Sequence, residues 1–157
     1  MKAVYLFLLA SLIGIEISIG VLLAPTIFYP EKFIGEGVLT HFQSGLLMTN
    51  IFIKFNYVLL GVSVLSILVE IFSFKNKHYS FKINFSKFML SLIILALSLL
   101  FVFYFSAYVL QAQNLGEEAT QTQEFIKIHG ASEVVMKIIM FSQLALFFLN
   151  FKKNDII

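Results

Sequence analysis

Four apolar segments dominate the sequence, and each is long enough to cross a lipid bilayer as a helix. They occupy approximately residues 3–24, 45–72, 88–109 and 131–151. At 1.5 Å per residue, about 20 helical residues cross a hydrocarbon layer of ~30 Å. The segments and their short loops leave no room for a soluble domain. The sequence therefore predicts an all-α membrane protein in which residues 1–157 form a single antiparallel bundle of four transmembrane helices.

The composition supports this interpretation and excludes several kinds of chemistry. Charged residues make up 13% of the chain and the mean hydropathy is +0.92, whereas soluble domains carry about 25% charged residues. The chain has no cysteine, which excludes disulfides, thiolate metal sites and thiol catalysis. All 11 basic residues are lysine, tryptophan is absent, and phenylalanine is abundant. This bias is typical of an AT-rich bacterial genome and indicates a bacterial inner (cytoplasmic) membrane.

The lysines near the ends of the apolar segments predict the orientation in the membrane. Seven fall on the side of the two termini and the middle loop, and two fall in the other loops. The seven are Lys2, Lys75, Lys77, Lys82, Lys87, Lys152 and Lys153, and the two are Lys32 and Lys127. Because cytoplasmic loops carry an excess of basic residues, we expect both termini to be cytoplasmic.

Three ionisable residues on three different helices are expected at a similar depth in the membrane. Glu16, Lys54 and Lys137 each lie ~10–14 Å inside the outer end of an apolar segment, counted at 1.5 Å per residue, and Glu133 lies one turn further out. A charge at mid-bilayer costs about 2.5–3.5 kcal/mol on the insertion scale. The pattern predicts a polar pocket or ion path. Its neutral lining residues are expected to be Asn50, Tyr57, Tyr104 and Gln143. The alternatives are a structural ion-pair network, or lysines that extend to the membrane surface.

Local signals mark the ends of several helices. Pro25 and Pro30 are expected to end the first span, because proline cannot donate the helical hydrogen bond. Thr40 and Gln43 fit a capping box at the start of the second helix. From there a polar stripe runs from Gln43 to Gly61 on one helix face, and we expect that face to point inward. Gly116 is the expected break after the third span, with the last helix beginning near Glu117.

Histidine and methionine residues raise the possibility of a metal site. His129 and Met136 are seven residues apart, and Met140 lies one turn further on, so the three share a helix face. Imidazole and thioether ligands together suit Cu(I), and a bis-histidine haem would need His41 opposite His129. The main expectation is that His129 lies at the membrane interface or at the rim of the pocket. No cofactor is predicted, and copper or haem is the minor alternative.

Two short motifs resemble a known family. The residues Gly20 to Phe28 read GVLLAPTIF and resemble the G…APxxF signature of a four-span bacterial family of unknown function (DUF4149-type). That family is similar to the eukaryotic transmembrane protein 205, which has been linked to cisplatin resistance. The residues Phe125 to Ser132, FIKIHGAS, resemble its F…LHGxS motif at the start of the last helix. The resemblance implies a small membrane protein of unestablished activity. It draws attention, without roles, to Pro25, Phe28, His129 and Ser132.

Three classes of function follow from these patterns. The intramembrane charges favour transport or export of a small polar, cationic or metal-containing solute. A face of small residues, Ser11, Gly14 and Ser18, favours instead a non-catalytic scaffold or accessory subunit, with a second copy or another membrane protein as partner. A copper- or haem-binding protein is the third. The sequence does not favour an enzyme, since no catalytic motif is present, and it predicts the lipid bilayer, not nucleic acid, as its surroundings.

Overall fold

The four expected membrane helices are present in the computed structural model, which describes residues 2–74 and 80–151. Four continuous helical segments are long and apolar enough to cross a membrane: Lys2–Phe28, His41–Ser73, Phe81–Leu115 and Gln123–Phe151. Each extends beyond the apolar run that predicted it. The expected fold class, an all-α bundle of four membrane helices, is confirmed.

The first and third of these segments are each built from two α-helices joined by a π-helical turn, and two short helices lie in the loops. In chain order the elements are α1 (Lys2–Ser18), η1 (Ile19–Leu23), α2 (Ala24–Phe28), α3 (Glu31–Ile34), α4 (His41–Ser73), α5 (Phe81–Leu100), η2 (Phe101–Ser106), α6 (Ala107–Leu115), α7 (Glu117–Thr120) and α8 (Gln123–Phe151).

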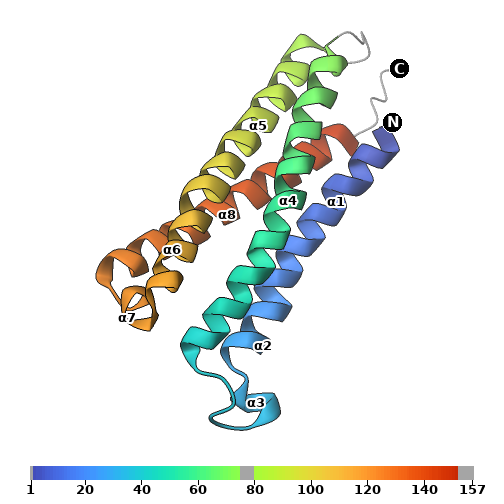
Figure 1. Ribbon diagram of the computed structural model, residues 1–157. Helices are drawn as coiled ribbons and strands as arrows, with labels where there is room; N and C mark the ends of the chain where they lie inside the picture. The colour runs from blue at the N-terminus through green and yellow to red at the C-terminus, as the bar shows by residue number, and fades with distance from the viewer. Residues whose placement is uncertain (1, 75–79, 152–157) are drawn as a thin grey trace.

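The long helices pack side by side along their lengths. α4 packs against α1 and α5, and α8 packs against α1 and α5. The start of α1 and the end of α8 lie at one end of the bundle, and α3 and α7 lie at the other (Figure 1). We call these the terminal end and the loop end. The core between the helices contains aliphatic side chains from all four, among them Leu12, Leu59, Ile94 and Ile139.

Pro25 does not end the first span, contrary to the prediction. The helix continues through it to Phe28, where the Tyr29 amide still donates to the Pro25 carbonyl at 3.1 Å. Pro25 lies in the first turn of α2, where a missing N–H group is tolerated. The preceding turn, η1, is π-helical, and the Ala24 amide donates to the Ile19 carbonyl five residues earlier. The wider turn accommodates the proline without a break.

Two predicted helix boundaries are confirmed and one is wrong. The Thr40 side chain accepts a hydrogen bond from the Gln43 amide at 3.1 Å, and the Gln43 side chain accepts one from the Thr40 amide at 2.9 Å. Gly116 ends α6 with a φ of +110°, a conformation that favours glycine. The last long helix does not begin near Glu117, because α7 forms a separate short turn and α8 begins at Gln123.

Candidate functional site

A buried ion pair joins α4 to α5 near the terminal end of the bundle. The Lys87 Nζ atom lies 3.2 Å from Oε2 of Glu70, and their side chains are 1% and 0% exposed. The contact is an ion pair rather than an aligned hydrogen bond, since Oε2 has no hydrogen-bond donor of regular geometry. Such a pair holds two helices in one register, because either charge alone would be strongly unfavourable in this environment.

The other two long helices complete this centre. From α8, the Asn150 side-chain amide donates to Oε1 of Glu70 at 2.7 Å and also to the Leu146 carbonyl at 3.1 Å. From α1, the buried Tyr5 places its hydroxyl beside Ser66 and Glu70, although it forms no regular hydrogen bond there. We call Tyr5, Ser66, Glu70, Lys87 and Asn150 the Glu70 centre. Every long helix contributes to it.

Polar side chains spaced seven residues apart lead from the Glu70 centre along the core. Residues seven apart lie on the same helix face, two turns away from each other. Ser63 and Glu70 on α4 have this spacing, and so do Gln143 and Asn150 on α8. Ser91 and Ser98 do the same on α5, and all six are buried. The Ser63 and Ser98 hydroxyls are 3.1 Å apart and share a hydrogen bond. The helices therefore meet along seams that are partly polar.

A second buried carboxylate lies in the middle of the bundle, where α1 packs against α8. Glu16 is 8% exposed and interacts with the side chain of Gln143, which is fully buried. In the part of the chain that the structure describes, neither oxygen of Glu16 and neither polar atom of the Gln143 amide has a hydrogen-bond partner. Gln143 lies eight residues, or about 12 Å of helix, from Phe151 at the terminal end. This carboxylate is therefore deep within a ~30 Å hydrocarbon layer.

A third polar contact joins α4 to the π-helical turn η2. The Asn56 side-chain amide donates to the Ser106 hydroxyl at 2.9 Å, and the Asn56 carbonyl oxygen has no partner. A pocket of about 250 Å³ lies beside Asn56. Its lining residues are Ile53, Asn56, Tyr57, Leu60, Val102 and Phe103.

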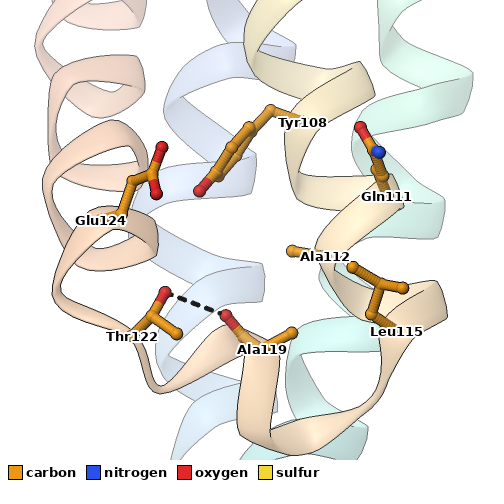
Figure 2. Close-up of a pocket in the computed structure, with 7 residues that line it drawn as sticks. All are labelled: Tyr108, Gln111, Ala112, Leu115, Ala119, Thr122 and Glu124. Atoms are coloured by element: carbon orange, nitrogen blue, oxygen red, sulfur yellow. Dashed lines mark hydrogen bonds between the residues drawn. The ribbon is translucent and has the colours of Figure 1, made fainter.

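At the loop end, a pocket of about 260 Å³ lies between α6, α7 and the start of α8. The residues that line it are Tyr108, Gln111, Ala112, Leu115, Ala119, Thr122 and Glu124 (Figure 2). The Tyr108 hydroxyl points toward the Glu124 carboxylate across the pocket (Figure 2). The Phe125 ring stacks on Tyr108, with centroids 6.4 Å apart. A carboxylate beside an aromatic ring suits a small cation.

Residues 7–118 match a family described as a domain of unknown function, DUF4149. The chain is a member of the DUF4149 family. The match covers more than half of the chain and includes the Gly20–Phe28 motif, Glu16, Glu70 and Lys87, and it ends before α8. Comparison with curated proteins and with solved structures found no match.

The polar stripe on α4 of this DUF4149 protein faces away from the core. The prediction that this face of the helix points inward is therefore wrong. Tyr57 is 76% exposed, and Asn50 and Lys54 are exposed as well. The opposite face, which includes Phe55 and Leu59, is buried in the core. The physical reason is depth. Lys54 lies 19 residues before Ser73, which is ~28 Å of helix and nearly the full hydrocarbon thickness. Its ammonium group can extend to the membrane surface from there.

The prediction that Glu16 shares one pocket or ion path with Lys54 and Lys137 is also wrong. Lys137 and Glu133 are 65% and 58% exposed on α8 and face each other across one turn, with Nζ 3.9 Å from Oε2. His129 shares the same carboxylate at 3.7 Å. Tyr104 is half exposed on η2. Of the residues predicted to line one pocket, the structure brings Glu16 and Gln143 together in the core and leaves the others on the surface.

The residues of the predicted metal site belong to two different environments. Met136 and Met140 pack against the hydrophobic core, while the half-exposed His129 ring stacks on Phe125 with centroids 5.7 Å apart. Within residues 2–74 and 80–151, no group of three or more His, Asp or Glu side chains is arranged to hold a metal ion. Copper and haem binding stay predictions from sequence.

The motif residues of the DUF4149 resemblance form local contacts at the loop end of the helices. The Phe28 ring lies 5.2 Å from the His41 ring, which joins the end of α2 to the start of α4. The buried Ser132 hydroxyl donates to the His129 carbonyl at 2.6 Å. Together with Pro25 in the first turn of α2, these contacts fix helix ends. Sequence reasoning missed Glu70 and Asn150, which the seven-residue spacing could have indicated, and it assigned Lys87 to a loop.

Proposed function

We propose that this DUF4149 protein transports a small cationic or polar solute across the membrane, with Glu16 as the group that balances its charge and the Glu70–Lys87 pair as a polar centre along the path. The observation that carries this proposal is the burial of two carboxylates in the core of a bundle with few charged residues. Ionisable residues inside membrane segments are costly and commonly mark the pathway of a substrate, an ion or a proton.

The two carboxylates lie at different heights, which suits passage along the bundle. Tyr5, which belongs to the Glu70 centre, precedes Glu16 by 11 residues on α1, or ~16 Å of helix. The hydroxyls of Ser63 and Ser98 lie on the core seam between α4 and α5 and offer neutral polar groups along it. At the loop end, the pocket at Tyr108 and Glu124 would collect a cation before it enters the core.

The orientation belongs to the same proposal. We place the protein in a bacterial inner membrane with its terminal end in the cytoplasm. Because Lys87 lies inside the bundle and not in a loop, the comparison of basic residues becomes six lysines against two, which still favours this orientation. Reporter fusions after Lys77 and after Gly116 test it. A periplasmic signal from the first fusion would overturn the orientation.

Flux measurements in proteoliposomes test the transport proposal. We expect the protein to carry labelled tetraethylammonium, or protons followed with an internal pH dye, faster than empty liposomes do. Glu16→Gln should abolish the flux, and Glu36→Gln is the matched control because Glu36 is exposed in the loop before α4. Equal flux in all variants, or flux no faster than in empty liposomes for both probes, would contradict the proposal.

A second candidate function is a scaffold within a membrane assembly, favoured by the outward polar face of α4. Asn50, Lys54 and Tyr57 are exposed there, and a Cβ atom added at the exposed Gly14 of α1 would meet nothing within 4 Å. A second copy or another membrane protein could cover these faces. Native mass spectrometry from mild detergent tests this: a complex that Tyr57→Ala disrupts would favour a scaffold, and a monomer at all concentrations would count against it.

A further inference from the structure

The side chains of Glu16 and Gln143 form an isolated polar pair with unsatisfied hydrogen-bonding groups. They are 8% and 0% exposed and lie beside each other between α1 and α8. Within residues 2–74 and 80–151, both Glu16 carboxyl oxygens, the Gln143 amide nitrogen and the Gln143 amide oxygen lack hydrogen-bond partners. Buried polar atoms in native proteins are nearly always paired. Four unpaired atoms on two adjacent side chains therefore call for a specific explanation.

The protonation state of Glu16 decides whether these atoms can pair. An ionised carboxylate only accepts hydrogen bonds, so the Gln143 amide could give it N–H groups while its own oxygen stayed unpaired. A protonated carboxyl group has one O–H donor. Its O–H can then donate to the Gln143 oxygen while the Gln143 nitrogen donates to the second carboxyl oxygen. This reciprocal pair, formed by rotation of the two side chains, would give each of the four atoms a partner.

Among the residues that the structure describes, no charged group beside Glu16 would keep it ionised. α1 packs against α4 and α8. On α8, Glu133 and Lys137 are exposed and pair with each other. On α4, Lys54 is exposed, and Glu70 lies at the level of Tyr5, ~16 Å along α1 from Glu16. The Lys87 ammonium is held by Glu70. The side chain found to interact with the Glu16 carboxyl group is the neutral Gln143.

We propose that Glu16 and Gln143 form a proton-binding site in the middle of the bundle, in which Glu16 is a neutral carboxylic acid paired reciprocally with the Gln143 amide. Release of the proton breaks the O–H···O bond and leaves a carboxylate that a cation can neutralise. The idea that a proton and a cation exchange at Glu16 during transport rests on the proposed function. The protonation of Glu16 itself does not depend on that function.

Labelling with dicyclohexylcarbodiimide tests the proposal on the full-length protein in detergent or nanodiscs. This apolar reagent adds a protonated carboxyl group across a C=N bond: the carboxyl oxygen bonds to its central carbon and the proton moves to nitrogen. Rearrangement gives a stable N-acylurea that peptide mass spectrometry locates. At pH 8 we expect labelling at Glu16 and not at Glu70, which is paired with Lys87. Glu36→Gln should leave the label on Glu16 unchanged, because Glu36 is exposed in the loop before α4.

Infrared spectroscopy supplies a second measurement that does not depend on reagent access. The carbonyl band of a protonated carboxyl group should be present in the wild type and lost in Glu16→Gln. It should move to higher frequency in Gln143→Leu, because the acid then loses its hydrogen-bond partner. Absence of the band and of the label at pH 8 would overturn the proposal. If Glu16 is labelled but the protein shows no flux, the proton-binding site stands and only its role in transport is ruled out.

Discussion

The two buried carboxylates of this bundle have opposite surroundings. Glu70 has a lysine 3.2 Å away and an asparagine amide on its other oxygen, whereas Glu16 has a neutral amide beside it and no regular hydrogen bond to any described residue. The comparison shows that burial alone does not determine what a carboxylate does. A cation within reach makes Glu70 an ionised link between helices, and the lack of one among its described neighbours leaves Glu16 as a group that can take up a proton.

The difference also predicts where the bundle is most sensitive to substitution. Breaking a buried ion pair leaves a charge without compensation and costs about 3–5 kcal/mol. A neutral acid replaced by an amide of the same shape leaves no such charge. The following substitutions sharpen or break this comparison, beginning with the one expected to have the largest effect.

Lys87→Met should give the largest loss of stability. The Glu70 carboxylate would remain buried without its cation, so we expect the free energy of unfolding to fall by about 3–5 kcal/mol. Thermal unfolding in detergent, followed by circular dichroism, measures this. The matched control is Lys82→Met, since Lys82 is exposed on the same helix. Similar melting curves for the two variants would show that the ion pair is not a main link between helices.

Asn150→Leu should have an intermediate effect. The substitution removes the donor to Oε1 of Glu70 and leaves a buried charged acceptor unsatisfied, which costs about 1–3 kcal/mol. Asn114→Leu is the control, because Asn114 is exposed at the loop end of α6. The same unfolding experiment serves. If Asn150→Leu is as stable as the wild type, the fourth helix does not depend on the Glu70 centre for its position.

Glu16→Gln should have the smallest effect, within ~0.5 kcal/mol of the wild type, as for substitutions that leave no buried charge unpaired. Two amides can form the same reciprocal pair that we infer for the acid and the amide. Glu70→Gln is the matched comparison, since the same replacement there strands the Lys87 ammonium. A loss at Glu16 as large as that at Glu70 would mean that Glu16 is ionised and paired with a cation.

The parts of the fold that local signals control could be predicted from sequence. Segment hydropathy gave the four helices, Thr40 and Gln43 gave the start of α4, and Gly116 gave the end of α6. Each depends on residues within a few positions of one another. The π-helical turn before Pro25 was not predicted, because proline is usually a signal for the end of a helix.

The candidate site was mostly not predictable, because it depends on which helix faces meet. The outward residues of α4, such as Lys54, look like a functional stripe until their distance from Ser73 places them near the membrane surface. Lys87 looks like a loop residue that sets the orientation. Its contact with Glu70 joins positions on two helices, and no local pattern gives that register. The seven-residue spacing of Gln143 and Asn150 was the one pattern in the sequence that could have indicated which face of α8 lies in the core.

A double-mutant cycle on Glu70 and Lys87 tests the central claim, that a buried ion pair holds the four helices together. Unfolding is measured for the wild type, Glu70→Leu, Lys87→Met and the double variant. We expect each single change to cost about 3–5 kcal/mol and the double variant to recover most of that loss, because replacing both charges with apolar groups can be nearly neutral. Additive losses, within ~0.5 kcal/mol, would show that the two residues do not interact and would contradict the claim.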